Sequence, residues 1–339
     1  MRRPTPRNVV LAGDVRTRLA ELAADSIDCV ITSPPYFLLR DYGVTGQLGL
    51  EATVGEWVDN LAGVLDQVQR VLRATGTLWL NVGDSYSRHE RYGAAAKGLL
   101  LGPERLLLEL SDRGWTLRNK IVWAKTNPRP ASVNDRLTCT WEPLYLLTTQ
   151  RRYYFDLDAV RVAHTSSVRR HLGGRRSTDS PGRGRPTWAG PLAGDNAGLS
   201  RLKAQGRVGH VLGKNPGDVW QLPASGYRGA HFATFPEALV ERPVLAGCPE
   251  RVCRRCQEPW RRAAARTVGR LAVRGELVAG CDCAAPYRPG LVLDPFMGAG
   301  TVALVAERLG RDWIGIELNP SFVELAEQRL AGQRAGRAA

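Results

Sequence analysis

A buried strand that stops at two adjacent prolines constrains the fold of this chain more than any other feature. Residues 26–31 form a short, mainly apolar run that predicts a buried parallel strand. Pro34 and Pro35 cannot continue it, because proline lacks an amide hydrogen and has a fixed φ angle. Each proline also pushes the residue before it into an extended conformation. The sequence therefore predicts a stiff loop at the carboxyl end of a strand, where open α/β sheets bind ligands.

The chemistry of this loop suits a planar amine. Ser33 supplies a hydroxyl, Pro34 supplies a carbonyl next to it, and Tyr36 supplies an aromatic face. The run contains no pair of nucleophile and base and no metal ligand. Two acceptors can hold N–H groups while a ring stacks on a base, so we expect Ser33, Pro34, Pro35 and Tyr36 to be the catalytic residues.

A second run of the same kind lies far downstream. Residues 291–293 predict a buried strand, which is followed by an acid (Asp294), a glycine-containing turn and a helix. Glycines let backbone amides approach a ligand closely, and a helix N-terminus favours a carboxylate. Glu317 ends the next strand, a position that suits hydrogen bonds to ribose hydroxyls.

Together the two runs resemble those of the amino-methylating DNA methyltransferases. Members of that family carry an (Asp/Asn/Ser)-Pro-Pro-(Tyr/Phe) catalytic loop and an Asp-Pro-Phe-x-Gly-x-Gly-Thr loop that binds S-adenosylmethionine. Shorter matches occur at Gly13-Asp14, around Lys125 and at residues 231–236. The resemblance covers residues 8–332 in patches and is weak over 160–217 and 246–288. A catalytic loop that precedes the cofactor loop is the permuted order of the family's beta class.

The resemblance implies an α/β, Rossmann-like S-adenosylmethionine-dependent methyltransferase fold. We expect a mostly parallel sheet with one antiparallel hairpin, which the residues place at 142–147 and 153–155. The motif order would be circularly permuted. The expected organisation is a catalytic half (8–159), a basic target-recognition insertion (160–217), a cofactor-pocket segment (218–247), a cysteine-rich zinc knuckle (248–288) and a cofactor-binding half (289–332).

The same resemblance assigns a cofactor-binding set to positions that match the family's motifs. The set is Asp14, Thr234, Phe235, Pro236, Asp294, Pro295, Phe296, Gly298, Gly300, Thr301, Glu317 and Asn319.

The charge of the chain predicts a polyanionic partner. The formal net charge is +14 and the isoelectric point is about 9.9, which is the electrostatic footprint of a nucleic-acid binder. Residues 168–188 are rich in arginine and show no apolar period, so they cannot fold alone. We expect this segment to contact DNA, with a solvated linker as the alternative. The expected DNA contacts are Lys125, Arg169, Arg170, Arg175, Arg176, Arg183 and Arg185.

Clustered cysteines predict a metal site. Cys253 and Cys256 form one close pair, and Cys281 and Cys283 form another across a basic arm. Two such pairs can supply four thiolates to one structural Zn²⁺. The alternative is a set of reduced surface thiols, which would be prone to oxidation.

The function that follows is methyl transfer from S-adenosylmethionine to the exocyclic N4 amine of cytosine in flipped-out duplex DNA. The alternatives are N6 methylation of adenine, methylation of RNA or protein, and a DNA-binding module without activity. We expect double-stranded DNA as partner, a cognate restriction endonuclease, a monomer or homodimer, and a cytoplasmic protein without membrane contact. The N-terminus lacks the apolar core of a signal peptide, and no run approaches the length of a membrane helix.

Overall fold

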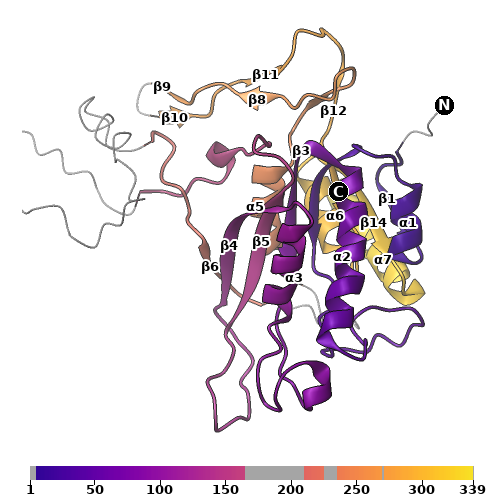
Figure 1. Ribbon diagram of the computed structural model, residues 1–339. Coiled ribbons are helices and arrows are strands. Elements are labelled where there is room, and N and C mark those ends of the chain that lie inside the picture. Colours follow the sequence, from indigo (N-terminus) through magenta and orange to yellow (C-terminus); the bar gives the residue numbers. More distant parts are fainter. Residues whose placement is uncertain (1–4, 165–209, 225–234, 269–270, 339) are drawn as a thin grey trace, which may run out of the picture.

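The computed structural model describes residues 5–164, 210–224, 235–268 and 271–338, and these residues are built around an eight-stranded sheet (Figure 1). The strand order is β1-β14-β13-β2-β3-β5-β4-β6. All neighbours are parallel except β5, which is antiparallel to both β3 and β4. The strand bounds are β1 Val9–Ala12, β14 Asp312–Glu317, β13 Leu291–Asp294, β2 Ile27–Thr32, β3 Leu72–Asn81, β5 Trp141–Thr148, β4 Thr116–Lys125 and β6 Val219–Leu222.

The antiparallel strand is confirmed, but its expected partner is wrong. β5 pairs with β4, which precedes it in the chain, and residues 153–155 form no strand. Tyr154 is instead buried, and its amide donates to the Thr75 carbonyl at 2.8 Å. The Phe155 ring stacks on Trp79 with centroids 6.4 Å apart. These aromatic side chains pack against the sheet rather than extend it.

Helices cover both faces of the sheet. On one face lie α1 (Val15–Glu21), α2 (Val54–Val71) and α3 (Gly102–Asp112), and on the other lie α5 (Glu237–Gly247), α6 (Thr301–Arg308) and α7 (Pro320–Ala338). Side chains on a strand alternate between faces. Val30 of β2 therefore joins the first core, and its neighbour Ile31 joins the second. Burial of each such side chain contributes roughly 1.5–3 kcal/mol.

Local sequence signals set where these helices begin. Thr53 caps α2 by accepting from the Glu56 amide at 3.2 Å, and Glu56 reaches back to accept from the Ala52 amide at 3.1 Å. This reciprocal arrangement is a capping box. Nine apolar side chains of α2 are buried at helical spacing. Two short 3₁₀ helices, η1 (Glu90–Tyr92) and η2 (Leu157–Ala159), lie in connecting segments.

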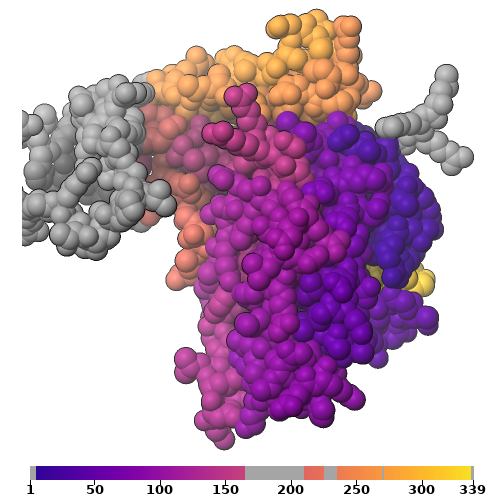
Figure 2. Space-filling model, viewed as in Figure 1, coloured from indigo at the N-terminus to yellow at the C-terminus, as the bar shows by residue number. Residues whose placement is uncertain are grey.

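Residues 248–288 form a module of short antiparallel strand pairs, called here the cysteine module. It pairs β7 (Val252–Cys253) with β12 (Tyr287–Arg288), β8 (Arg261–Arg262) with β11 (Leu277–Val278), and β9 (Arg266–Val268) with β10 (Leu271–Val273). It projects along the top of the molecule in Figures 1 and 2, at the amino ends of β2 and β13.

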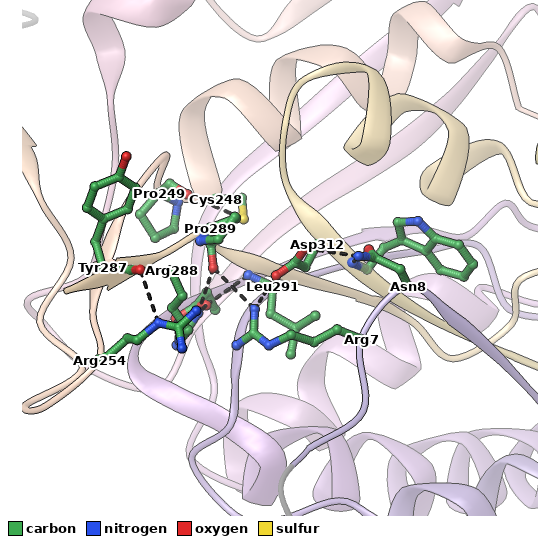
Figure 3. Close-up of polar contacts among 12 residues, drawn as sticks. Arg7, Asn8, Cys248, Pro249, Arg254, Tyr287, Arg288, Pro289, Leu291 and Asp312 are labelled. Atoms are coloured by element: carbon green, nitrogen blue, oxygen red, sulfur yellow. Dashed lines mark hydrogen bonds and ion pairs between the residues drawn. The ribbon is translucent and has the colours of Figure 1, made fainter. Parts of the chain in front are cut away.

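A buried arginine joins the cysteine module to the sheet. Arg288 donates to Asp28 of β2 at 2.6 Å, and the same carboxylate accepts from the Leu291 amide at 2.8 Å. Arg288 also donates to the Pro289 carbonyl at 2.9 Å, and Arg254 donates to the Tyr287 carbonyl at 3.1 Å (Figure 3). The side chains of Arg288 and Asp28 are 8% and 4% exposed, so this ion pair is a buried contact between the module and the first core strand.

Candidate active site

A cavity of about 350 Å³ opens at the carboxyl ends of the central parallel strands. Loops that follow β1, β2, β13 and β14 contribute to its walls, as expected for an open α/β sheet. Among the residues predicted from the sequence, its lining includes Asp14, Ser33, Pro34, Pro35, Tyr36, Lys125, Phe235, Pro295, Phe296, Gly298, Thr301, Glu317 and Asn319.

Strand pairing brings the two predicted loops together. β13 lies directly beside β2, with Val292 opposite Cys29 and Leu293 opposite Val30. At the strand ends, the Thr32 hydroxyl donates to Asp294 Oδ1 at 2.8 Å, although the residues are 262 positions apart in sequence. The catalytic loop and the glycine loop therefore leave the sheet side by side and face one cavity.

The glycine loop is held open by an acid from the next strand. Glu317, at the end of β14, accepts from the Gly298 amide at 2.7 Å and from the Asn319 amide at 2.8 Å. Gly298 has a φ of +51°, a conformation that side chains other than glycine rarely adopt. Burial raises the pKa of the Glu317 carboxyl, and its backbone hydrogen bonds oppose that shift. The result is an acid at the cavity wall with both oxygens oriented.

Three of the predicted cofactor-binding residues that the structure describes lie beside the cavity without lining it. Asp294 is 2% exposed; besides Thr32, it accepts from the Phe296 amide at 3.1 Å. Burial raises its pKa to about 7. Gly300 caps α6 with a φ of +77°, and Pro236 precedes α5. Asp294 thus fixes the shape of the glycine loop from behind. Thr234 lies outside the described residues.

The catalytic loop is part of a polar network that crosses three strands. The Tyr36 hydroxyl lies 3.0 Å from Glu142 Oε2 and 3.2 Å from Asn81 Oδ1, and it accepts from the Ser33 hydroxyl at 3.4 Å. Lys125 forms an ion pair with Glu142. Burial is the main cause that raises the pKa of Tyr36, and the Glu142 charge adds to it. The phenol therefore remains protonated.

The sequence analysis missed Asn81 and Glu142. Both occupy sheet positions next to the cavity: Asn81 ends β3, and Glu142 begins β5. A polar residue at the carboxyl end of an apolar strand is a usable signal for Asn81. Glu142 gave no such signal, because it lies at the start of the antiparallel strand.

The loop of residues 37–51 closes one side of the cavity. Tyr42 lies on it and meets Phe322 of α7 edge to face, with ring centroids 6.2 Å apart. The Tyr42 carbonyl accepts from the Asn319 side-chain amide at 3.3 Å. These contacts connect the loop to the cofactor-binding half. Two aromatic rings beside Glu317 give the cavity an apolar wall that suits a planar ligand.

The predicted DNA contacts have different outcomes. Lys125 lines the cavity, where it pairs with Glu142 and lies 4.9 Å from the Trp123 ring centre. The ammonium is therefore part of the active site rather than of a free basic surface. The predicted arginines of the basic insertion, Arg169, Arg170, Arg175, Arg176, Arg183 and Arg185, lie outside the described residues.

The four predicted metal ligands come together at the other end of the molecule. The sulfur atoms of Cys253, Cys256, Cys281 and Cys283 all lie within 4.8 Å of one another. The Cys256 backbone amide donates to the Cys253 sulfur and is the main cause that lowers the pKa of Cys253 to about 6. Four sulfurs at this spacing form a set that one tetrahedral ion can bind.

Comparisons with known proteins agree with this site. A family model described as DNA methylase, of the N6/N4 type, matches residues 27–328. The chain is 32% identical over 348 aligned residues to the Type II methyltransferase M.XycI of Xanthomonas campestris pv. cyanopsidis, covering 96% of this chain and 88% of the relative. It is 31% identical to M.Cfr9I of Citrobacter freundii, with 95% and 87% covered.

Solved structures share the fold. The PvuII DNA methyltransferase (cytosine-N4-specific) has a TM-score of 0.57 at 19% identity, with 96% of this chain and 86% of that chain covered. A DNA modification methylase from Thermus thermophilus, solved with S-adenosyl-L-methionine, has a TM-score of 0.53 at 20% identity, with 96% and 93% covered. Among the described residues, no helix has both the length and the apolar character that crossing a membrane requires. The sequence match over most of its length shows that this chain belongs to the DNA methylase family of amino-methylating DNA methyltransferases.

Proposed function

We propose that this protein transfers a methyl group from S-adenosylmethionine to the N4 amine of cytosine in double-stranded DNA. One observation carries the proposal: a single cavity is lined both by the Ser33–Tyr36 loop and by the glycine loop with Glu317. The first loop offers acceptors for an exocyclic amine, and the second offers a carboxylate and backbone amides for a nucleoside. A cavity of about 350 Å³ has room for such ligands.

The glycine loop fits the cofactor. When bound, S-adenosylmethionine would supply an electrophilic methyl group. The Glu317 carboxylate is oriented by two backbone amides and lies at the position where ribose hydroxyls are recognised. Tyr42 and Phe322 provide an aromatic wall next to it. Phe235 borders the same cavity from the segment before α5.

The Ser33 loop would activate the amine of the target base. Conjugation with the base ring makes that nitrogen a poor nucleophile. The Ser33 hydroxyl oxygen and the Pro34 carbonyl would accept its N–H groups and favour a pyramidal nitrogen. Such acceptors accelerate transfer because they stabilise charge that grows in the transition state. The base must leave the duplex to reach this depth, and extrusion costs a few kcal/mol.

Serine at the first position of the loop supports cytosine as the target. In the family, serine at this position resembles enzymes that methylate cytosine N4, and aspartate or asparagine resembles those that methylate adenine N6. The PvuII enzyme, whose fold this chain shares, is described as cytosine-N4-specific. Adenine N6 remains the second candidate, because both targets are conjugated exocyclic amines that a hydroxyl can accept from.

Duplex DNA as substrate agrees with the net charge of +14. We propose that the arginines between 169 and 185 contact its backbone, and that a restriction endonuclease of the same specificity accompanies the enzyme. Its sequence relatives are named Type II methyltransferases, which supports a role in restriction and modification. Monomer and homodimer remain the two expected assemblies.

We further propose that the cysteine module holds one structural Zn²⁺. The support is the set of four sulfurs within 4.8 Å of one another, which matches the ligand type and number of structural zinc sites. The site lies at the amino ends of the strands, whereas the cavity lies at their carboxyl ends (Figure 1). The ion would therefore stabilise the module and take no part in methyl transfer.

The direct test of the activity is methyl transfer from labelled S-adenosylmethionine to a panel of substrates. We expect label in duplex DNA and none in RNA or protein. Binding of the labelled cofactor without transfer to any DNA would instead support an inactive DNA-binding module.

A further inference from the structure

The polar network behind Ser33 has a direction. The Tyr36 oxygen accepts from Ser33 Oγ at 3.4 Å, and the Tyr36 proton lies between Glu142 Oε2 at 3.0 Å and Asn81 Oδ1 at 3.2 Å. The Asn81 side-chain nitrogen donates to the Pro143 carbonyl at 2.9 Å, which turns its oxygen toward the phenol. Every group beyond Tyr36 is thus an acceptor. Because the carboxylate is nearer and charged, it is the stronger partner.

This arrangement leaves one lone pair of Ser33 facing the cavity. The hydroxyl protons of Ser33 and Tyr36 both point away from the cavity, toward Glu142. A distance of 3.4 Å between two hydroxyl oxygens is long, and such contacts commonly tighten when substrate fills the site.

We propose that Glu142 is the final proton acceptor of a relay that runs from the target amine through Ser33 and Tyr36. This inference rests on the function proposed above and deepens it. As the new N–C bond forms and the S–C bond breaks, the amine nitrogen becomes positive. Its proton passes to Ser33 Oγ, the Ser33 proton passes to the Tyr36 oxygen, and the Tyr36 proton passes to Glu142. Serine and tyrosine end neutral, and the carboxylate becomes a carboxylic acid.

Lys125 explains how the relay is reset. Its ammonium pairs with the charged form of Glu142, so protonation of the carboxylate leaves that positive charge without a counter-charge. The imbalance favours loss of the proton from Glu142. The side chain of Glu142 is 24% exposed, which gives the proton a route to water. Glu142 therefore acts as a positioning and proton-accepting residue through Tyr36 and does not need to touch the base.

The chain offers a matched control on the same strand. Lys120 of β4 pairs with Glu104 at 2.8 Å, five positions before Lys125, and neither residue lines the cavity. Glu104→Gln removes a carboxylate from a Lys–Glu pair of the same type outside the site. Tyr153→Phe is the control for the phenol, since its hydroxyl only accepts from Arg118 at 3.1 Å.

The test compares single-turnover methyl transfer to duplex DNA with the dissociation constants for S-adenosylmethionine and DNA. Glu142→Gln and Tyr36→Phe should each slow transfer about 100-fold, the scale of a lost proton-transfer step, while both dissociation constants stay within about twofold. The two control variants should transfer at the wild-type rate. Sodium formate should restore Glu142→Ala at least about tenfold over sodium chloride of equal ionic strength, because Lys125 attracts a small carboxylate.

Wild-type transfer rates in Glu142→Gln or in Tyr36→Phe would overturn the relay and leave the proposed function intact. Slow transfer by Glu142→Ala that formate does not restore would also overturn it, because the carboxylate would then be structural. Wild-type protein that methylates RNA or protein but not DNA would overturn the proposed function and the relay together.

Discussion

The cavity and the cysteine module lie at opposite ends of the same strands and are ordered by different means. In the cavity, functional groups are fixed by the sheet itself: β2 and β13 place the two loops side by side, and each carboxylate is held by backbone amides or hydroxyls. In the module, strands of two or three residues leave little core to bury. Four cysteine sulfurs gather there instead.

This difference teaches which part of the protein tolerates loss of a ligand. The pocket keeps its shape through packing that exists without cofactor. The module depends on cross-links that a metal would provide, as in other small domains with too little apolar surface. The two regions are coupled through the buried Arg288–Asp28 ion pair, because Asp28 lies on β2, the strand that leads to Ser33.

Removal of metal should have the largest effect. Purified protein should contain about one equivalent of zinc, and a strong chelator should unfold the cysteine module, since structural zinc contributes about 10 kcal/mol in small domains. Hydrogen exchange should show lost protection over residues 248–288 before the sheet is affected. Protein that is free of metal, fully folded in this module and fully active would contradict the zinc proposal.

The next largest effect should come from Ser33→Ala. The hydroxyl faces only the target amine and Tyr36, so turnover should fall about 100-fold to 1,000-fold while cofactor affinity is unchanged. Ser111→Ala, an exposed serine on α3, is the matched control. Equal loss of cofactor binding and turnover would show that Ser33 supports the fold of the pocket instead.

Asp294 should make the stability of the ligand-free protein depend on pH. Its pKa is raised by burial from 3.8 to about 7, so the folded state binds more protons than the unfolded state between these values. The free energy of unfolding should therefore fall as pH rises from about 4 to about 7, by on the order of 3 kcal/mol. Asp294→Asn keeps an acceptor for Thr32 and should remove this slope in denaturant titrations, whereas Asp112→Asn on α3 should preserve it.

Glu317→Ala should have the smallest effect of the set. Loss of hydrogen bonds to a charged group should weaken S-adenosylmethionine binding by roughly 1.5–3 kcal/mol, measured by calorimetry. Because Glu317 also holds the Gly298 and Asn319 amides, Glu317→Gln separates the two contributions. Glu324→Ala on α7 serves as the surface control. Affinity equal to wild type in Glu317→Ala would exclude the ribose role.

The sequence predicted the parts of the site that lie within short motifs. The Ser33 loop and the glycine loop each follow an apolar strand, and strand pairing alone brings them to one cavity. Glu142 could not be predicted in the same way, because its place depends on β5 inserting antiparallel between β3 and β4. The burial of Asp294 was also beyond the motif, since it follows from the Thr32 contact across 262 residues. The fold class was confirmed, and the individual site roles stay predictions.

The most direct test of the account is the identity of the methylated base. The gene should be expressed in a host without DNA methylation of its own, in wild-type form and as Ser33→Ala, and the DNA digested to nucleosides for mass spectrometry. The account predicts N4-methylcytosine with the wild-type protein and little or none with Ser33→Ala. N6-methyladenine would contradict the assignment of cytosine, and unmodified DNA from an expressed, folded wild-type protein would contradict the proposed activity.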